Sequence, residues 1–328
     1  MPSIALMTTH ANFPWFRQIP GGGDCIGAWR FTLNRVEPDC ALVVVYDEPL
    51  AAFECPLPAT RRILITTEPP GMKRYHARFA NQFGHLMGPV DVPGFTGARY
   101  ITHPALNWFY GIGFTKSGVV ANLDYDALAA LTPPDKQEAV SIILSKKAKL
   151  PKHRARLAFV AEAQRVLGKR VRVFGRGFEE VADKAEAITP FAYHIVLENN
   201  DLPHFWTEKT ADSLLGWALP LFSGCANISD HFPQDAFIPL DISDPRAAAV
   251  RVQAILEEAP YQARLPALAT ARKRLMEEHN LFVILAKWAE GMAPAGVLAE
   301  AEVIRPNAAF APILTRLAKG VRSSFKRG

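Results

Sequence analysis

Charged and polar residues gather where one apolar run of the sequence ends and where the next helical pattern begins. Glu198 and Asn199 close the run, and Glu208 and Lys209 open the helical pattern. Free N–H groups at a helix start attract anions, whereas a lysine there is unfavourable unless an anion accompanies it. The two glutamates could accept hydrogen bonds from sugar or ribose hydroxyls. This spacing predicts a site for a phosphorylated sugar, with solvated charges at a helix start as the alternative.

Two more charged residues stand at similar places. Arg154 opens another helical pattern and could supply a second cation. Glu68 follows the apolar run 62–66 and precedes Pro69 and Pro70, which cannot extend a strand. We therefore expect its carboxylate at the carboxyl end of a strand, where α/β sheets place functional groups. A solvated acid in a turn is the alternative.

Other motifs indicate structure more than chemistry. Asp124 and Asp126 could chelate a divalent cation, but Asp124 precedes a helical run and is better explained as an N-cap. Gly175 and Gly177 follow an apolar run, and without a third glycine they indicate a tight turn. The sequence has no zinc-ligand spacing, no P-loop and no nucleophile elbow, which argues against metal hydrolases, kinases and serine hydrolases.

Composition restricts the class of protein further. The chain has 328 residues, of which 49% are hydrophobic and 21% charged, so it can bury sizeable cores. It has no apolar run of about 18 residues, and its four cysteines lack paired spacing, which indicates reduced thiols. The net charge of +5 comes from Arg305 to Gly328, where six Lys/Arg and no acid occur, and the remaining 31 basic residues face 32 acidic ones. This neutral body argues against a nucleic-acid binder.

The elements that would position these residues alternate along the chain. Short apolar runs predict strands at 4–7, 41–46, 62–66, 140–144, 170–174, 194–197 and 219–222. Helical spacing predicts helices at 153–167, 207–217, 246–258 and 261–292, the last interrupted at Pro266. Alternating strands and helices predict an α/β fold with parallel sheets. Pro133 and Pro134 mark a linker between domains 1–135 and 136–292, followed by a Pro/Ala-rich basic tail at 293–328.

The ordered motifs of the second half resemble glycosyltransferase family 10, the α-1,3-fucosyltransferases and their relatives. In chain order they read SK, HRxRLxFV, VFGRG, DK, YHIVLEN, FWTEK and LPLFSG, within residues 141–240. The resemblance upstream depends mainly on TTEPP at 66–70. It implies an α/β GT-B fold, in which two Rossmann-like domains face each other across a cleft and the C-terminal domain binds a GDP-sugar.

The same resemblance implies an inverting transfer of L-fucose from GDP-fucose to a glycan hydroxyl. Glu68 would match the acidic base on the acceptor side. The donor-binding residues would be Arg154, Glu198, Asn199, Phe205, Glu208 and Lys209, with Phe205 standing where the family often has tyrosine. Two preorganised cations can stabilise the negative charge that develops on the leaving diphosphate. We therefore expect no cofactor and no requirement for a divalent metal.

Two alternatives stay open: the same fold with another GDP-sugar, and a catalytically silent sugar-nucleotide-binding scaffold docked on a membrane. In the tail, Ile313, Leu317, Val321 and Phe325 recur among basic residues, which is typical of an amphipathic helix on an anionic leaflet. A solubilising tail is the other interpretation. We expect an oligosaccharide or glycolipid acceptor, no nucleic-acid partner, and a cytoplasmic protein that could attach peripherally to the inner face of the membrane.

Aromatic residues in the loops 12–30 and 95–114 suit stacking on sugar rings, although they could equally belong to a core. They are Phe13, Trp15, Phe16, Trp108, Phe109 and Tyr110.

Overall fold

The chain divides into two compact units. The computed structural model describes residues 1–102, 107–116, 118–146, 148, 151–292 and 300–311. Unit 1 holds Met1–Ala11, Gly27–Ile101 and the described residues from Trp288 onward, and unit 2 holds Asn12–Ile26 and the described residues from Thr102 to Lys287. This division differs from the one predicted at Pro133 and Pro134, since residues upstream of that linker group with unit 2 and residues late in the chain group with unit 1.

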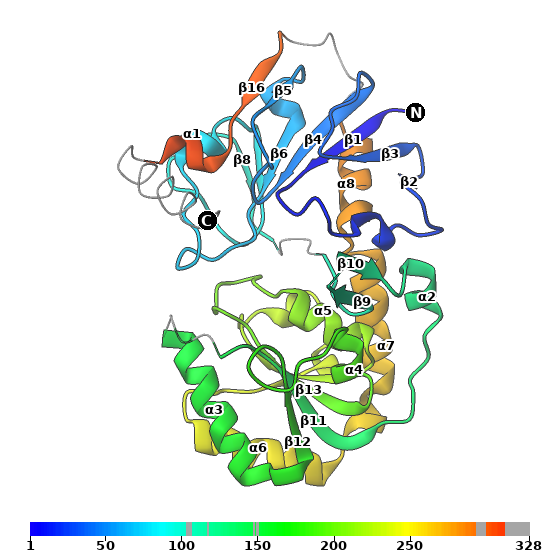
Figure 1. The fold of residues 1–328 in the computed structure, drawn as a ribbon, viewed down its shortest axis with the longest axis vertical. Coiled ribbons are helices and arrows are strands. Elements are labelled where there is room, and N and C mark those ends of the chain that lie inside the picture. Colours follow the sequence, from blue (N-terminus) through cyan, green and yellow to red (C-terminus); the bar gives the residue numbers. More distant parts are fainter. Residues whose placement is uncertain (103–106, 117, 147, 149–150, 293–299, 312–328) are drawn as a thin grey trace. The chain divides into compact units, whose positions relative to one another are not determined.

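Unit 1 is built on a parallel sheet (Figure 1). Its strands run in the order β3 (Trp29–Leu33), β1 (Ser3–Met7), β4 (Cys40–Tyr46), β6 (Arg62–Ile65), β7 (His85–Met87) and β8 (Ala98–Tyr100), and each neighbouring pair is parallel. Every residue of β4 and β6 is buried, as expected for central strands of a sheet that is covered on both faces. The carboxyl ends of β4 and β6 therefore bring Asp47 and Glu68 to one edge.

A segment late in the chain completes unit 1. Strand β16 (Glu302–Ile304) pairs antiparallel with β5 (Phe53–Cys55), beside the short helices η2 (Ala59–Arg61), α1 (Ala77–Ala80) and η6 (Asn307–Phe310). The buried guanidinium of Arg62 pairs with Glu302 at 2.6 Å and donates to the Leu57 carbonyl at 2.7 Å. Part of the predicted tail is therefore ordered structure, whereas the predicted amphipathic helix lies outside the described residues.

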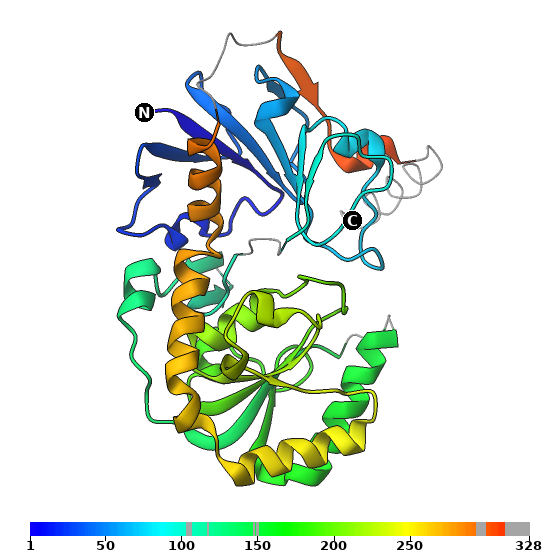
Figure 2. The same ribbon diagram turned by 180° about the vertical axis from the view of Figure 1, so that it is seen from behind.

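Unit 2 is a second parallel sheet covered by helices on both faces (Figures 1 and 2). Its strands run in the order β12 (Val171–Phe174), β11 (Gln137–Ile143), β13 (Phe191–Leu197), β14 (Leu219–Ser223) and β15 (Ile238–Pro239). Helices α3 (Pro151–Leu167) and α6 (Pro245–Glu258) pack together on one face, and α4 (Lys184–Ile188), α5 (Glu208–Leu215) and α7 (Tyr261–Glu277) cover the other. The chain order reverses between β11 and β13, which is where open α/β sheets bind ligands.

The segment Asn12–Ile26 belongs to unit 2 because polar side chains fix its backbone there. Arg17, in the short helix η1 (Trp15–Gln18), donates to the carbonyls of Trp108 and Tyr110 at 2.9 Å each. Burial lowers the pKa of Arg17 to about 10, although the charge of Asp212 opposes this shift. The remaining elements are β2 (Cys25–Ile26), the hairpin of β9 (Ile112–Thr115) and β10 (Gly118–Ala121), α2 (Tyr125–Ala130), η3 (Gly168–Arg170), η4 (Ile228–Asp230) and η5 (Gln234–Ala236).

The two parallel sheets confirm the predicted α/β class with Rossmann-like units, as in a GT-B fold. Each predicted strand is present as β1, β4, β6, β11, β12, β13 or β14. Asp124 caps α2 by accepting from the Ala127 N–H at 2.9 Å, as predicted. The turn interpretation of Gly175 is also confirmed, since its φ is +108° and an added Cβ would lie 2.2 Å from the Leu144 carbonyl oxygen.

The predicted interruption of the last long helix at Pro266 is wrong. Pro266 lies inside α7, and the chain instead breaks between α7 and α8 (Leu281–Glu290). Asn280 causes this break, because its side chain accepts from the Phe282 N–H at 3.0 Å and so begins a new helix. The boundary between the units falls within α8, between Lys287 and Trp288.

Candidate donor-binding and catalytic site

The carboxylate of Glu198 is the centre of the polar cluster at the carboxyl end of β13. It is fully buried and accepts hydrogen bonds from the Thr207 N–H at 2.7 Å, the Thr207 hydroxyl at 2.7 Å and the Thr210 hydroxyl at 3.2 Å. Thr207 is also the N-cap of α5, where its side-chain oxygen accepts from the Lys209 N–H. Glu198 therefore ties the start of α5 to the end of β13.

Lys209 joins the two glutamates of the cluster. Its ammonium nitrogen lies 3.1 Å from Glu208 and 3.5 Å from Glu198, and it donates to the Thr207 hydroxyl at 2.9 Å. Burial opposes the charged form of Lys209, but the two carboxylates outweigh it and raise its pKa. Burial likewise works against the Glu208 carboxylate, yet Lys209 and Lys184 lower its pKa to about 2. Both groups are therefore held charged in a fixed arrangement.

The structure brings Arg156, and not Arg154, to this cluster. The side chain of Arg156 is buried and donates to Asn199 Oδ1 at 2.7 Å and to the Leu197 carbonyl at 3.2 Å. Its Nε has no hydrogen-bond partner among the described residues. Arg154 is exposed and donates to the Ala148 carbonyl at 3.3 Å. Arg156 shares the buried face of α3 with Phe159 and Val160, and the motif alone does not show which face of this helix is buried.

Phe205 is the predicted donor contact that the structure places in the core. It is only 1% exposed. The adjacent Trp206 packs edge-on against His231 and His279, with ring centroids 5.8 and 5.5 Å apart. His204 also bonds to His231, at 3.1 Å between ring nitrogens. These ring contacts anchor the loop that leads from Asn199 to α5.

A second pair of charges borders the cluster from the α4 side. Lys184 lies 2.6 Å from Asp212, which also accepts from the N–H groups of Phe109 and Tyr110 at 2.8 Å each. Lys184 and Asp212 share a cavity of about 170 Å³ with Glu208 and Lys209. Lys184 belongs to the DK motif of the sequence, and the cavity places it beside the predicted donor residues Glu208 and Lys209.

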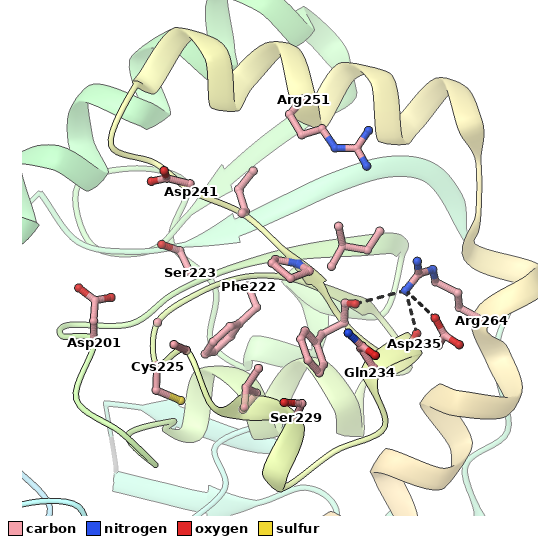
Figure 3. A pocket seen from close by; sticks show the side chains of 17 residues that line it. Asp201, Phe222, Ser223, Cys225, Ser229, Gln234, Asp235, Asp241, Arg251 and Arg264 are labelled. Carbon is pink, nitrogen blue, oxygen red and sulfur yellow. Dashed lines mark hydrogen bonds and ion pairs between the residues drawn. The ribbon is translucent and has the colours of Figure 1, made fainter.

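A larger cavity, of about 860 Å³, begins next to the cluster and follows β14 and β15 (Figure 3). It starts at Ser223 and Gly224, and an added Cβ on Gly224 would lie 3.0 Å from Glu198 Cγ. At its other end Arg264 donates to the carbonyls of Asp235 and Phe237 at 3.2 Å each. This cavity could hold the part of a ligand that extends beyond the charged cluster.

The aromatic residues proposed for sugar stacking fall into two groups. Trp15, Trp108 and Tyr110 are buried and belong to the core. Phe13 and Phe109 are half-buried, and their ring centroids lie 5.3 Å apart. Phe16, also half-buried, packs on Phe282.

Glu68 lies in unit 1, three residues beyond β6, and is half-buried. Its backbone N–H donates to the Tyr75 hydroxyl at 3.2 Å. The other acids at this edge are Asp47 and Glu48, and both pair with Lys73, at 2.8 and 2.9 Å. Asp47 and Glu48 therefore share one lysine as their counter-ion, and Glu68 lies at the same edge of the sheet.

Metal ligands give no additional site within the described ranges. No group of three or more His, Cys, Asp or Glu side chains there could hold a metal ion. In the same part of the chain, no helix combines the length and the apolar character needed to cross a membrane.

Comparison with protein families identifies the domain that carries the cluster. Residues 133–261 match the model described as glycosyltransferase family 10 (fucosyltransferase), C-terminal part. The resemblance to family 10 is confirmed. The family 10 segment includes β11 to β15, the cluster around Glu198 and most of the larger cavity. It supports a fucosyltransferase-like glycosyltransferase, whereas a search of curated proteins finds no match.

Solved structures are similar over more of the chain than the family 10 segment. An α1,3-fucosyltransferase is 14% identical with a TM-score of 0.48, over 89% of this chain and 91% of that one. The structure titled α1,3-fucosyltransferase with GDP-fucose gives 13% and 0.47, over 92% and 94%. A UDP-forming trehalose-phosphate synthase from Burkholderia xenovorans gives 12% and 0.45, over 79% and 75%. Because these TM-scores are below 0.5, we base the fold assignment on the two parallel sheets of this chain.

Proposed function

We propose that this protein is an inverting glycosyltransferase that transfers L-fucose from GDP-fucose to a hydroxyl of a glycan acceptor. The observation that carries the proposal is the buried Arg156, which lies within the family 10 segment. Its guanidinium is buried and donates to the neutral oxygens of Asn199 and Leu197, so a donor phosphate would be a charged partner for it. The match of residues 133–261 to the fucosyltransferase family supports the choice of donor.

The charged cluster suits the departure of a diphosphate. Displacement at the anomeric carbon leaves negative charge on the leaving GDP, and cations that are already in place stabilise this charge without reorganisation. Lys209 is fixed by Glu198 and Glu208, and Lys184 is fixed by Asp212. With Arg156, these groups supply the stabilisation that a divalent metal would otherwise give, so we expect transfer without added metal.

Glu68 is proposed as the general base in unit 1. A carboxylate at the end of a strand can accept the proton of the attacking acceptor hydroxyl. Direct attack by the acceptor hydroxyl on the face opposite to GDP would invert the anomeric configuration.

The test is transfer by the purified full chain. GDP release would be measured with GDP-fucose, GDP-mannose and GDP-glucose in the presence and absence of a glycan panel, with and without EDTA. We expect acceptor-dependent release from GDP-fucose that EDTA does not abolish, and inverted anomeric stereochemistry by NMR. Preference for another GDP-sugar would contradict the donor assignment, and binding without turnover would favour the silent scaffold.

A further inference from the structure

A segment late in the chain lies against the loop that carries Glu68. After β16, the Arg305 backbone exchanges two hydrogen bonds with the Gln82 side chain, at 2.8 and 2.9 Å. The chain then reaches Asn307, which is only 7% exposed, and the next N–H, of Ala308, donates to Glu48 at 3.2 Å. These contacts join residues more than 200 positions apart in the sequence.

The carboxamide of Asn307 holds the backbone on both sides of Tyr75. Its oxygen accepts from the His76 N–H at 2.9 Å, and its nitrogen donates to the Arg74 carbonyl at 2.9 Å. A buried amide that uses both its donor and its acceptor in this way fixes the position of the residue between its two partners.

Tyr75 in turn holds the backbone of Glu68. Its hydroxyl oxygen accepts from the N–H groups of Thr67 and Glu68, at 3.1 and 3.2 Å, and its O–H donates to Asp47. Tyr75 is 6% exposed, and Asp47 is held in turn by Lys73 at 2.8 Å. Asn307 therefore fixes the position of Tyr75, and the hydroxyl of Tyr75 fixes the position of the Glu68 backbone.

We propose that Asn307 is a positioning residue for the Glu68 loop and acts through Tyr75. The proposal rests on the proposed function, in which Glu68 takes the acceptor proton. General-base catalysis needs the carboxylate within hydrogen-bond reach of that proton, so a small displacement of the loop reduces turnover more than it reduces donor binding.

The experiment compares Asn307→Ala with Gln82→Ala in the full chain. Both substitutions remove two side-chain hydrogen bonds between the C-terminal segment and the rest of unit 1, but only Asn307 bonds to the residues that flank Tyr75. In Asn307→Ala we expect amide hydrogen exchange at Thr67 and Glu68 to accelerate about tenfold or more. We also expect kcat to fall roughly tenfold or more, with KM for GDP-fucose unchanged.

Gln82→Ala should accelerate exchange at Arg305 and leave Thr67, Glu68 and kcat unchanged. Tyr75→Phe keeps the ring and removes the hydroxyl, so it should reproduce the exchange change of Asn307→Ala at Thr67 and Glu68. Unchanged exchange at these two amides in Asn307→Ala, or an equal rise in Gln82→Ala, would overturn the proposal. Because exchange does not depend on turnover, a chain that transfers no fucose but shows the expected exchange pattern would contradict the proposed function alone.

Discussion

The ammonium of Lys209 is a counter-ion of the fully buried Glu198, and we have proposed it as a contact of the donor diphosphate. We expect Lys209→Ala to abolish measurable transfer and also to destabilise the fold by about 1–3 kcal/mol, because Glu198 loses a partner.

Lys209→Arg separates the two roles. The guanidinium keeps the positive charge beside Glu198 but not the ammonium geometry, so we expect near-parental stability with strongly reduced turnover. Thermal unfolding and GDP-release rates of both variants would be measured, with the exposed Lys273→Ala as control. Parental turnover in Lys209→Ala would contradict the donor-site assignment.

Glu68→Gln tests the base. The amide keeps the size of the side chain but cannot accept the acceptor proton, so turnover should fall about 10²–10⁴-fold while GDP-fucose affinity is unchanged. The matched control is Glu54→Gln, which changes an exposed acid of the same unit. Turnover of Glu68→Gln close to that of the parent would exclude Glu68 as the base.

Four of the predicted donor residues lie together in the cluster, whereas the arginine beside them is Arg156 and not the predicted Arg154. Glu198, Asn199, Glu208 and Lys209 are predictable because they stand at the end of a strand or the start of a helix, where the chain itself determines the position. Arg154 and Arg156 differ by two positions, which places them on different faces of α3. Which face is buried depends on packing against β12 and α6, and the motif alone does not show this.

Among the turns of unit 2, the one after β12 depends most strictly on glycine. Gly175 has a φ of +108°, and an added Cβ would lie 2.2 Å from the Leu144 carbonyl oxygen. We expect Gly175→Ala to destabilise the protein by roughly 2–4 kcal/mol, because backbone strain and a steric clash add together. Gly168→Ala is the control, since Gly168 has a φ of +53° with open space around it and should cost about 1 kcal/mol. Equal shifts in the midpoint of thermal unfolding would show that the close approach has no energetic effect.

A strand can be predicted from the sequence when all its residues are buried and therefore apolar. A strand that exists only because it hydrogen-bonds to a neighbouring strand leaves no such pattern. The run of valines in β4 is entirely buried and therefore reads as a strand in the sequence. Strand β8 is exposed at each of its three residues, and β16 exists because Arg62 and β5 hold it, so neither has an apolar pattern to detect. The sequence likewise does not show that Asn12–Ile26 belongs to unit 2, since Arg17 joins this segment to unit 2 by hydrogen bonds to backbone carbonyls.

The stability of the whole molecule should depend on buried histidines. Burial lowers the pKa of His194 to about 3, and burial together with His279 and His204 lowers that of His231 to about 4. Below about pH 6.5 the unfolded chain takes up protons that the folded protein does not bind, so stability is fully present above this pH and falls as the pH decreases. We expect His231 to account for about 2 kcal/mol of the loss between about pH 7 and about pH 5.

Denaturant unfolding at both pH values would measure this loss. His231→Gln should reduce the difference in unfolding free energy between the two pH values, whereas His10→Gln, at an exposed position, should not. A pH dependence in His231→Gln equal to that of the parent would contradict the assignment.

The basic residues after Ala311 are the predicted site of membrane attachment. Truncation after Ala311 keeps β16 and Asn307 and removes the basic residues beyond them, so we expect it to abolish binding to anionic vesicles without changing turnover on soluble acceptors. Truncation before Asn307 is not a clean test, because it also removes the contacts to Arg74 and His76. Undiminished vesicle binding after truncation at Ala311 would exclude the tail as the anchor.

The pairing of β16 with β5 has a consequence for synthesis on the ribosome. Strand β5 is made early, but its partner and Asn307 emerge only after the whole of unit 2. Unit 2 can therefore fold during translation, whereas unit 1 cannot be completed until β16 and Asn307 have been synthesised. We expect a nascent chain that stops shortly before residue 302 to contain a folded unit 2 and a unit 1 whose β5 edge stays open to chaperones or to other chains.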